Sequence, residues 1–286
     1  MKYDIKDLSI EEKIGQMTLI GLNTKTSLEK LEEIIVDYKV GGILIYKKNY
    51  SDYSEMIELI NRIKYLNQKN KIPIFIAIDQ EGGRVNRFPN EFKNIPSANK
   101  LAKNSQKKNL VKIAGNITGK TLNKLGINMN FAPVLDIKRF KDNHAIGDRA
   151  YSENIEEVSK YGIDYIKQLQ ENKVVSVVKH FPGHGATMYD SHFKIPKIRK
   201  NLKELENEDM VPFKKAIENQ VDGILVGHLK LHNYITSEPV SMSKQFVAKY
   251  LRKKYRYNGL IITDDMRMKA VKYRYGKNRA IKKAFL

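Results

Sequence analysis

The chain has no cysteine, no long apolar run and no recognisable leader among its 286 residues. Without cysteine, neither disulfide bonds nor thiolate metal sites are available to it. No apolar run approaches the ~20 residues that a membrane-spanning helix needs. Residues 1–16 carry charges throughout and lack the apolar core of a secretory signal. These absences predict a soluble, cytoplasmic protein with no membrane span.

Two nucleotide-binding signatures are also missing. The segment E-G-G-R-V at 81–85 lacks the G-x-G-x-x-G spacing of a dinucleotide-binding turn, and the sequence offers no phosphate-binding loop. No linker rich in Pro, Gly or Ser divides the chain, and no repeat or low-complexity segment interrupts it. We therefore expect one domain over residues 1–286, a length that α/β barrels commonly have. The sequence does not specify an oligomeric state.

Positive charge is in excess, with 52 Lys and Arg against 32 Asp and Glu and a net charge of +20. The excess is concentrated in residues 244–286, which contain 14 Lys and Arg against 2 Asp. One explanation is an anionic partner such as nucleic acid or an acidic wall polymer. The basic residues, however, alternate at helical spacing with Phe246, Tyr250 and Leu251, which is typical of a solvated helix face. We favour the second explanation and expect no nucleic-acid partner.

Short apolar segments alternate with longer amphipathic segments along the whole chain. Continuous Val, Ile and Leu runs without strict alternation are typical of strands covered on both faces, as in a parallel sheet. Repeated strand–helix units of this size predict a doubly wound sheet or a barrel. The expected strands lie within residues 17–22, 41–46, 72–79, 127–137, 174–180, 221–229 and 259–264. The clearest helices between them span residues 53–70, 109–125, 155–172 and 202–219.

Polar side chains that can do chemistry follow five of these apolar runs. A barrel assembles its active site from the carboxyl ends of many strands, whereas an open sheet concentrates its site at one switch point. Five contributing strands therefore favour an α/β fold of the (β/α)8 TIM-barrel type, of which seven strands are recognisable. The side chains are Asp79, Asp136, Lys179 with His180, His228 and Asp264.

The segment K-H-F-P-G-H-G-A-T-M-Y-D-S-H at 179–192 holds three of the six histidines. It can be a turn-rich loop with structural histidines, or a metal site built from His180, His184, Asp190 and His192. The third explanation is acid/base catalysis, in which Asp190 orients and polarises His192. Metal-dependent barrel hydrolases usually carry His-x-His on their first strand, and the first expected strand lacks it, so we expect no metal.

Two further segments place acids after an expected strand. Asp264 and Asp265 follow the last apolar run directly. Asp265 can be the N-cap of a following helix, which leaves Asp264 as the acid at the barrel mouth. In the segment D-Q-E-G-G-R-V-N-R-F at 79–88, Gly82 and Gly83 permit a close backbone approach, and carboxylates beside arginines can grip a polyol. A purely structural, salt-bridged turn is the alternative.

Taken together, these motifs resemble glycoside hydrolase family 3. K-H-F-P-G-H-G followed by D-S-H resembles its bacterial branch of single-domain β-N-acetylglucosaminidases of peptidoglycan recycling. In that branch a histidine replaces the second-domain glutamate that other branches use as acid/base. The matching segments follow in the family's order and lie at residues 79–88, 130–136, 147–151, 179–192 and 263–266.

The resemblance implies roles for single residues. Asp264 corresponds to the nucleophile, His192 to the acid/base, and Asp190 to the carboxylate paired with it. The resemblance also implies a β-N-acetylhexosaminidase that acts on an amino-sugar oligosaccharide or muropeptide, without cofactor or metal. The positions that bind the sugar in the family correspond to Asp79, Arg87, Arg149, Lys179 and His180.

The implied reaction is hydrolysis with retention, through a covalent glycosyl–Asp264 intermediate and with imidazole in place of one of the usual two carboxyl groups. A pKa near neutrality allows His192 to donate a proton in the first step and to accept one in the second. One alternative is a phosphorylase of the same fold, in which phosphate replaces water. Another is an inactive saccharide-binding relative, against which the presence of Asp264, Asp190 and His192 argues.

The recognisable strands number seven, and the chain stops in an amphipathic segment at residues 279–286. The resemblance implies an eighth strand and a closing helix beyond this point. We therefore expect the chain to be a C-terminally truncated form of a longer protein, because a seven-strand barrel leaves strand edges unpaired.

Overall fold

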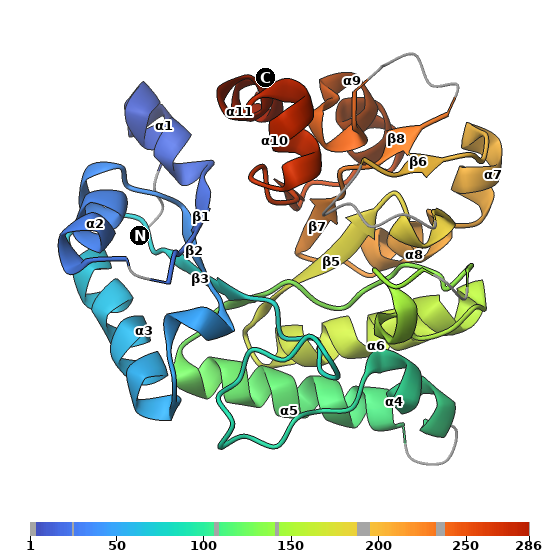
Figure 1. Ribbon diagram of the computed structural model, residues 1–286, viewed down its shortest axis with the longest axis horizontal. Helices are drawn as coiled ribbons and strands as arrows, with labels where there is room; N and C mark the ends of the chain where they lie inside the picture. Colours follow the sequence, from blue (N-terminus) through green and yellow to red (C-terminus); the bar gives the residue numbers. More distant parts are fainter. Residues whose placement is uncertain are drawn as a thin grey trace.

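The structure is a computed structural model that describes residues 4–24, 26–105, 109–140, 143–187, 195–232 and 238–285. Seven strands, all paired in parallel, form one curled sheet in the order β1–β2–β3–β4–β5–β7–β9. Figure 1 shows α3, α5 and α6 along the outer side of this sheet. The strands are β1 (Leu19–Gly21), β2 (Gly42–Ile45), β3 (Phe75–Ile78), β4 (Met129–Asn130), β5 (Val175–Phe181), β7 (Gly223–Val226) and β9 (Leu260–Thr263).

Helices separate most of the strands, and a second, two-stranded parallel sheet joins β6 (Lys197–Ile198) to β8 (Lys230–Leu231). No helix in the described ranges is long and apolar enough to cross a membrane. The α-helices are α1 (Ile10–Gln16), α2 (Leu28–Glu32), α3 (Tyr53–Asn67), α4 (Ala98–Asn104), α5 (Leu110–Leu125), α6 (Ile155–Glu171), α7 (Leu202–Asn207), α8 (Val211–Glu218), α9 (Lys244–Val247), α10 (Lys269–Tyr275) and α11 (Lys277–Phe285).

Two glycines allow α5 and α6 to pack closely, side by side (Figure 1). A Cβ added at Gly115 would lie 3.0 Å from the Cβ of Gln168, and one at Gly119 would lie 2.9 Å from the Cβ of Asn172. Larger residues at these positions would push the two helices apart. Because α5 leads into β4 and α6 leads into β5, this packing fixes the neighbouring strands from which the site is built.

The parallel register brings the carboxyl ends of the strands to one rim. Ile78 of β3 pairs with Asn130 of β4, and Val226 of β7 pairs with Thr263 of β9. The residue after each strand therefore lies at the same edge, where a barrel carries its site. This register explains how Asp79 and Asp264, far apart in the sequence, come to the same rim.

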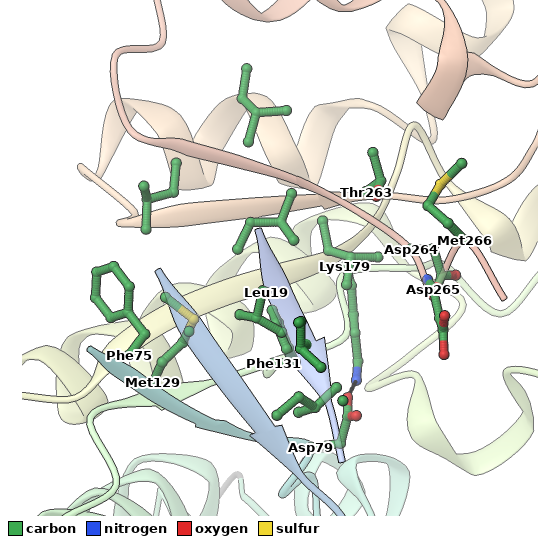
Figure 2. Close-up of a pocket in the computed structure, with 18 of the residues that line it drawn as sticks. Leu19, Phe75, Asp79, Met129, Phe131, Lys179, Thr263, Asp264, Asp265 and Met266 are labelled. Atoms are coloured by element: carbon green, nitrogen blue, oxygen red, sulfur yellow. Dashed lines mark hydrogen bonds and ion pairs between the residues drawn. The ribbon is translucent and has the colours of Figure 1, made fainter. Parts of the chain in front are cut away.

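The sheet does not close on itself within the described residues, so the fold is a half-barrel. There β1 pairs with β2 alone and β9 with β7 alone. A cavity of about 2130 Å³ is lined by residues of both edge strands and by apolar side chains of the inner face. Arg267, after β9, reaches the carbonyl oxygen of Gly21 at the end of β1 with an Nη1–O distance of 3.2 Å. Figure 2 shows the inner-face residues Leu19, Phe75, Met129 and Phe131.

The structure confirms the seven parallel strands that the sequence predicts. The single helix expected over residues 202–219 was wrong, because α7 and α8 divide that segment. Glu208 leaves helical geometry at φ −125° and ψ −79°, and Pro212 lies in the first turn of the second helix, which begins at Val211. Proline lacks an N–H and clashes with the preceding turn, so it is tolerated at a helix start and not in a helix interior.

Candidate active site

The loop after β3 is folded back onto the rim by hydrogen bonds to a side-chain amide and by two glycines. Asn130 on β4 accepts a hydrogen bond from the Gln80 N–H and donates one to the Gln80 carbonyl, both at 2.9 Å. Gly82 and Gly83 have φ values of +91° and +56°, and a Cβ at Gly83 would lie 2.6 Å from the Cβ of Ser97. Glycine adopts this left-handed backbone without steric cost. The turn directs the Glu81 carboxylate toward β5.

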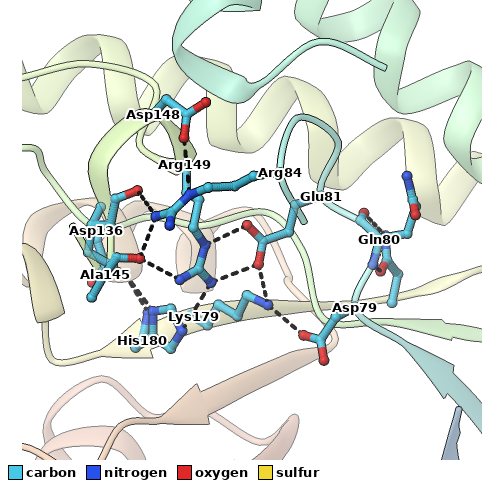
Figure 3. Close-up of polar contacts among 12 residues, drawn as sticks. Asp79, Gln80, Glu81, Arg84, Asp136, Ala145, Asp148, Arg149, Lys179 and His180 are labelled. Carbon is cyan, nitrogen blue, oxygen red and sulfur yellow. Dashed lines mark hydrogen bonds and ion pairs between the residues drawn. The ribbon is translucent and has the colours of Figure 1, made fainter. Parts of the chain in front are cut away.

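Four side chains from three segments form a buried ion network (Figure 3). Lys179 Nζ on β5 lies 2.6 Å from Asp79 Oδ1 and 2.6 Å from Glu81 Oε1. Arg149 donates Nε and Nη2 to the two Glu81 oxygens, each at 2.8 Å. Burial raises the pKa of Glu81, but the charges of Arg149 and Lys179 outweigh it and hold that pKa well below its ordinary value. Glu81 is therefore ionised at neutral pH.

His180 is oriented by a carboxylate behind it. Asp136 is fully buried and accepts hydrogen bonds from His180 Nδ1 at 2.6 Å, the His180 N–H at 3.2 Å and the His184 N–H at 2.5 Å. A carboxylate in this role only accepts, so Nδ1 carries the proton and Nε2 faces Arg149 Nη2 at 3.5 Å. Burial raises the pKa of Asp136, but His180 and the His184 N–H hold it below its ordinary value.

His184 should make the protein less stable in mild acid. Burial, with a smaller effect of His180, lowers the pKa of His184 from 6.5 to about 4. Between these values the unfolded chain binds a proton that the folded protein does not. The free energy of unfolding should therefore fall by roughly 3 kcal/mol as the pH falls from about 6.5 to about 4.

Urea denaturation at pH 7 and pH 4.5 measures this fall, with His184→Gln as the matched variant. The variant should lose much less stability between the two pH values than the wild type. An equal loss in both proteins would show that other groups cause the acid sensitivity.

Asp264 follows β9 directly and lies at the same end of the cavity as Lys179 and Asp79 (Figure 2). Its backbone N–H donates to the Val226 carbonyl at 3.0 Å, and its Oδ1 accepts the Asp265 N–H at 2.8 Å. Burial raises the pKa of Asp264, but surrounding charges hold it below its ordinary value, so the group is ionised at neutral pH. The charges come from His228, His180 and Lys179.

The neighbouring acid has a different position. Asp265 Oδ1 accepts the Arg267 N–H at 2.8 Å, and both Asp265 oxygens receive hydrogen bonds from the Arg267 side chain. Asp265 therefore caps the turn after β9 and not a helix, because α10 begins at Lys269 with Met268 as its N-cap. The helix-capping role that the sequence suggests for Asp265 was wrong. Of the two adjacent acids, Asp264 is the one whose carboxylate is not tied to an arginine among the described contacts.

The structure brings together four of the five predicted sugar-binding residues, Asp79, Arg149, Lys179 and His180. Arg87 lines the same cavity, and its backbone is fixed by Gln80 and Tyr50. That these residues bind a sugar stays a prediction. Asp190 and His192 lie outside the described residues. Within the described ranges no group of three His, Asp or Glu side chains is arranged to hold a metal ion, and the prediction that no metal is needed stays a prediction.

Comparison with models of protein families shows the family of this chain. The model of the glycosyl hydrolase family 3 N-terminal domain matches residues 9–286. The chain belongs to glycosyl hydrolase family 3. The family predicted from the five sequence motifs is therefore confirmed.

Curated relatives and solved structures of the family carry related names. The chain is 34% identical to a beta-hexosaminidase of Tolumonas auensis over 82% of its own length and 70% of the relative's. It superposes with a TM-score of 0.90 and 32% identity on a family 3 beta-N-acetylglucosaminidase of Paenibacillus, over 97% of this chain. NagZ from Neisseria gonorrhoeae, in complex with N-trifluoroacetyl-D-glucosamine, matches with a TM-score of 0.84 and 26% identity, over 94% of this chain and 78% of NagZ. The chain spans 53% of the Paenibacillus protein.

The sequence did not predict that three further residues contact the predicted residues of this family 3 site. Glu81 was noticed only as part of a charged turn, whereas it links Arg149 to Lys179. Asp136 and His228 were noticed only as polar strand ends, and they contact His180 and the turn after Asp264. The usable signal was their position, because any polar residue that ends a barrel strand faces the rim.

Proposed function

We propose that the protein is a retaining β-N-acetylglucosaminidase that removes a terminal non-reducing sugar, with muropeptides as the substrate class. The observation that carries the proposal is the ionised Asp264 carboxylate at the same rim as the Asp79–Lys179 ion pair. A retaining glycosidase needs an anionic nucleophile beside polar groups that fix the sugar. The names of the relatives support an N-acetylhexosamine as that sugar.

In the first step Asp264 attacks the anomeric carbon while the bond to the leaving oxygen breaks, which gives a glycosyl ester. His192, oriented by Asp190, protonates that oxygen. In the second step His192 takes a proton from water, the water oxygen attacks the anomeric carbon, and the carboxylate of Asp264 leaves. Two inversions give net retention. The lowered pKa of Asp264 keeps the nucleophile charged at neutral pH without help from a base.

The ion network supplies the contacts to the sugar. Asp79 can accept hydrogen bonds from hydroxyl groups, and Lys179 and Arg149 can donate to hydroxyl or acetamido oxygens. Because each cation also holds a carboxylate, its position is fixed before substrate arrives, which lowers the entropic cost of binding. Further cationic side chains line the cavity and complement the carboxylates of a muropeptide, among them Lys48, Arg84, Arg87 and Arg267.

Chromogenic substrates test the proposal. Nitrophenyl N-acetyl-β-glucosaminide should be hydrolysed far faster than nitrophenyl β-glucoside, and proton NMR should show the β-anomer as the first product. Turnover without added phosphate is expected. A strict requirement for phosphate, with a sugar 1-phosphate as product, would replace the hydrolase by the phosphorylase. Absence of turnover with either acceptor would overturn the enzymatic proposal.

The acid/base role of His192 predicts a dependence on the leaving group. His192→Ala should lower kcat/KM for N,N′-diacetylchitobiose by roughly 10²–10⁴-fold, the usual contribution of a general acid. The loss should be far smaller for a dinitrophenyl glycoside, because dinitrophenolate leaves without protonation. Asp190→Asn should show the same pattern in milder form. Equal losses on both substrates would assign His192 a structural role.

A further inference from the structure

One buried histidine at the rim neither attacks the sugar nor transfers a proton in the reaction as proposed. His228 follows β7 and has no exposed surface. Both of its ring nitrogens have partners in other segments. Nδ1 lies 2.7 Å from the Ser241 hydroxyl oxygen, and Nε2 lies 3.0 Å from the carbonyl oxygen of Asp265. A buried imidazole held at both ends has one orientation.

The partners also fix which nitrogen carries the proton. A carbonyl oxygen only accepts hydrogen bonds, so the Asp265 contact requires a proton on Nε2. The Ser241 hydroxyl is a partner for Nδ1 in either protonation state, because it can donate to a bare nitrogen or accept from an Nδ1–H. The short segment that carries Ser241, Val240–Met242, is itself tied to the chain after β7, because the Val240 N–H donates to the Leu229 carbonyl at 2.8 Å.

The acceptor of this hydrogen bond is the carbonyl of the residue next to the proposed nucleophile. The Asp265 N–H donates to Asp264 Oδ1 at 2.8 Å, while the Asp265 carbonyl receives the His228 N–H at 3.0 Å. The Asp264 N–H is held by the Val226 carbonyl on β7. The backbone on both sides of Asp264 is therefore anchored, by the Asp264 N–H to Val226 of β7 and by the Asp265 carbonyl to His228, two residues beyond β7.

We infer that His228 is a positioning residue for the nucleophile, through its Nε2–H bond to the Asp265 carbonyl. The inference rests on the proposed role of Asp264. Loss of the bond frees the turn to rotate and moves the carboxylate relative to the bound sugar. A displacement of about 1 Å at a reacting group can lower a rate about 10²-fold. Binding should change little, because the predicted sugar contacts come from β3, β5 and the Arg149 segment.

A pair of amide substitutions separates this bond from the bulk of the ring. Glutamine can place an amide N–H near the position of the imidazole Nε2, whereas asparagine reaches only to the position of Nδ1. His228→Asn should slow covalent labelling of Asp264 by a deactivated fluoro-sugar about 100-fold, and His228→Gln should stay within about 10-fold of wild type. KM should change less than kcat. The exposed His232→Asn is the matched control and should label at the wild-type rate.

Intact-protein mass spectrometry measures the labelling rate, and thermal melts show whether each variant is folded. Equal rates for His228→Asn and wild type, or equal losses in the Asn and Gln variants, would overturn the inference. If the His228 variants do not fold, Ser241→Ala tests the orientation of the same ring, because it removes the partner of Nδ1 on the side opposite the Asp265 carbonyl. It should label several-fold more slowly, and an unchanged rate would overturn the inference. Failure of the wild type to be labelled at Asp264 would instead overturn the proposed function.

Discussion

Asp264→Ala should lower kcat by roughly 10⁴-fold or more, because no other described group can replace the carboxylate in the proposed covalent step. The fold should be unaffected, since the hydrogen bond that anchors this position to β7 comes from the backbone N–H. Steady-state kinetics on a nitrophenyl N-acetyl-β-glucosaminide measures the loss. Circular dichroism and a thermal melt show that the variant is folded.

Two controls make this experiment specific. Azide should partly restore nitrophenol release by Asp264→Ala and give the α-glycosyl azide, because the small anion attacks from the face that the carboxylate occupied. Asp265→Asn retains an oxygen that can accept the Arg267 N–H, so it should lose far less activity than Asp264→Ala. Covalent labelling at Asp265 by a deactivated fluoro-sugar would show that the nucleophile is the second acid.

Glu81→Ala should cause the second large effect, on stability as well as on activity. The substitution leaves Arg149 and Lys179 without the carboxylate that joins them, although Lys179 keeps Asp79. Removal of one partner from a buried charge network typically lowers the free energy of unfolding by ~3–5 kcal/mol. Activity should fall at temperatures where the variant is still folded, because the freed cations can turn toward Asp264.

Urea denaturation measures the stability loss, with Glu33→Ala as a control. Glu33 pairs with Lys30 in a solvent-exposed ion pair, so its removal should leave the urea midpoint close to wild type. A Glu81→Ala protein as stable as the control would mean that water or a rotated Asp79 replaces the lost carboxylate. Wild-type activity in that variant would show that Glu81 has no role in the active site.

The strands were predictable because each is an apolar run covered on both faces, and this signal does not depend on the rest of the fold. The two-residue strands β6 and β8 left no such signal, since they pair with each other and lie outside the main sheet. The break between α7 and α8 was missed although Pro212 marks it. The rule that proline starts a helix and is not tolerated in its interior was available there, but the amphipathic pattern on both sides of Pro212 obscured it.

Some residues of the site were likewise predictable from the sequence, and others were not. Asp79 and Asp264 were predictable because each follows a strand, and Lys179 because it lies near the carboxyl end of β5. Parallel register alone brings strand ends together. The role of Glu81 was not predictable, because its partner Arg149 is 68 positions away and the turn that joins them depends on left-handed glycines. Pairing between side chains on loops needs the loop conformation, which sequence patterns do not give.

Because β1 and β9 do not pair in the described part of the chain, the edge strand β9 is where local unfolding should begin. The strand that leads to Asp264 has one strand neighbour in the described part of the chain, β7, and on its other side the Arg267 guanidinium reaches Gly21. Opening such an edge takes less free energy than melting the whole domain. On heating, the carboxylate should lose its alignment while the helices are still intact. The highest temperature at which the protein turns over substrate would then be set by local opening of the β9 edge and not by the global melting point.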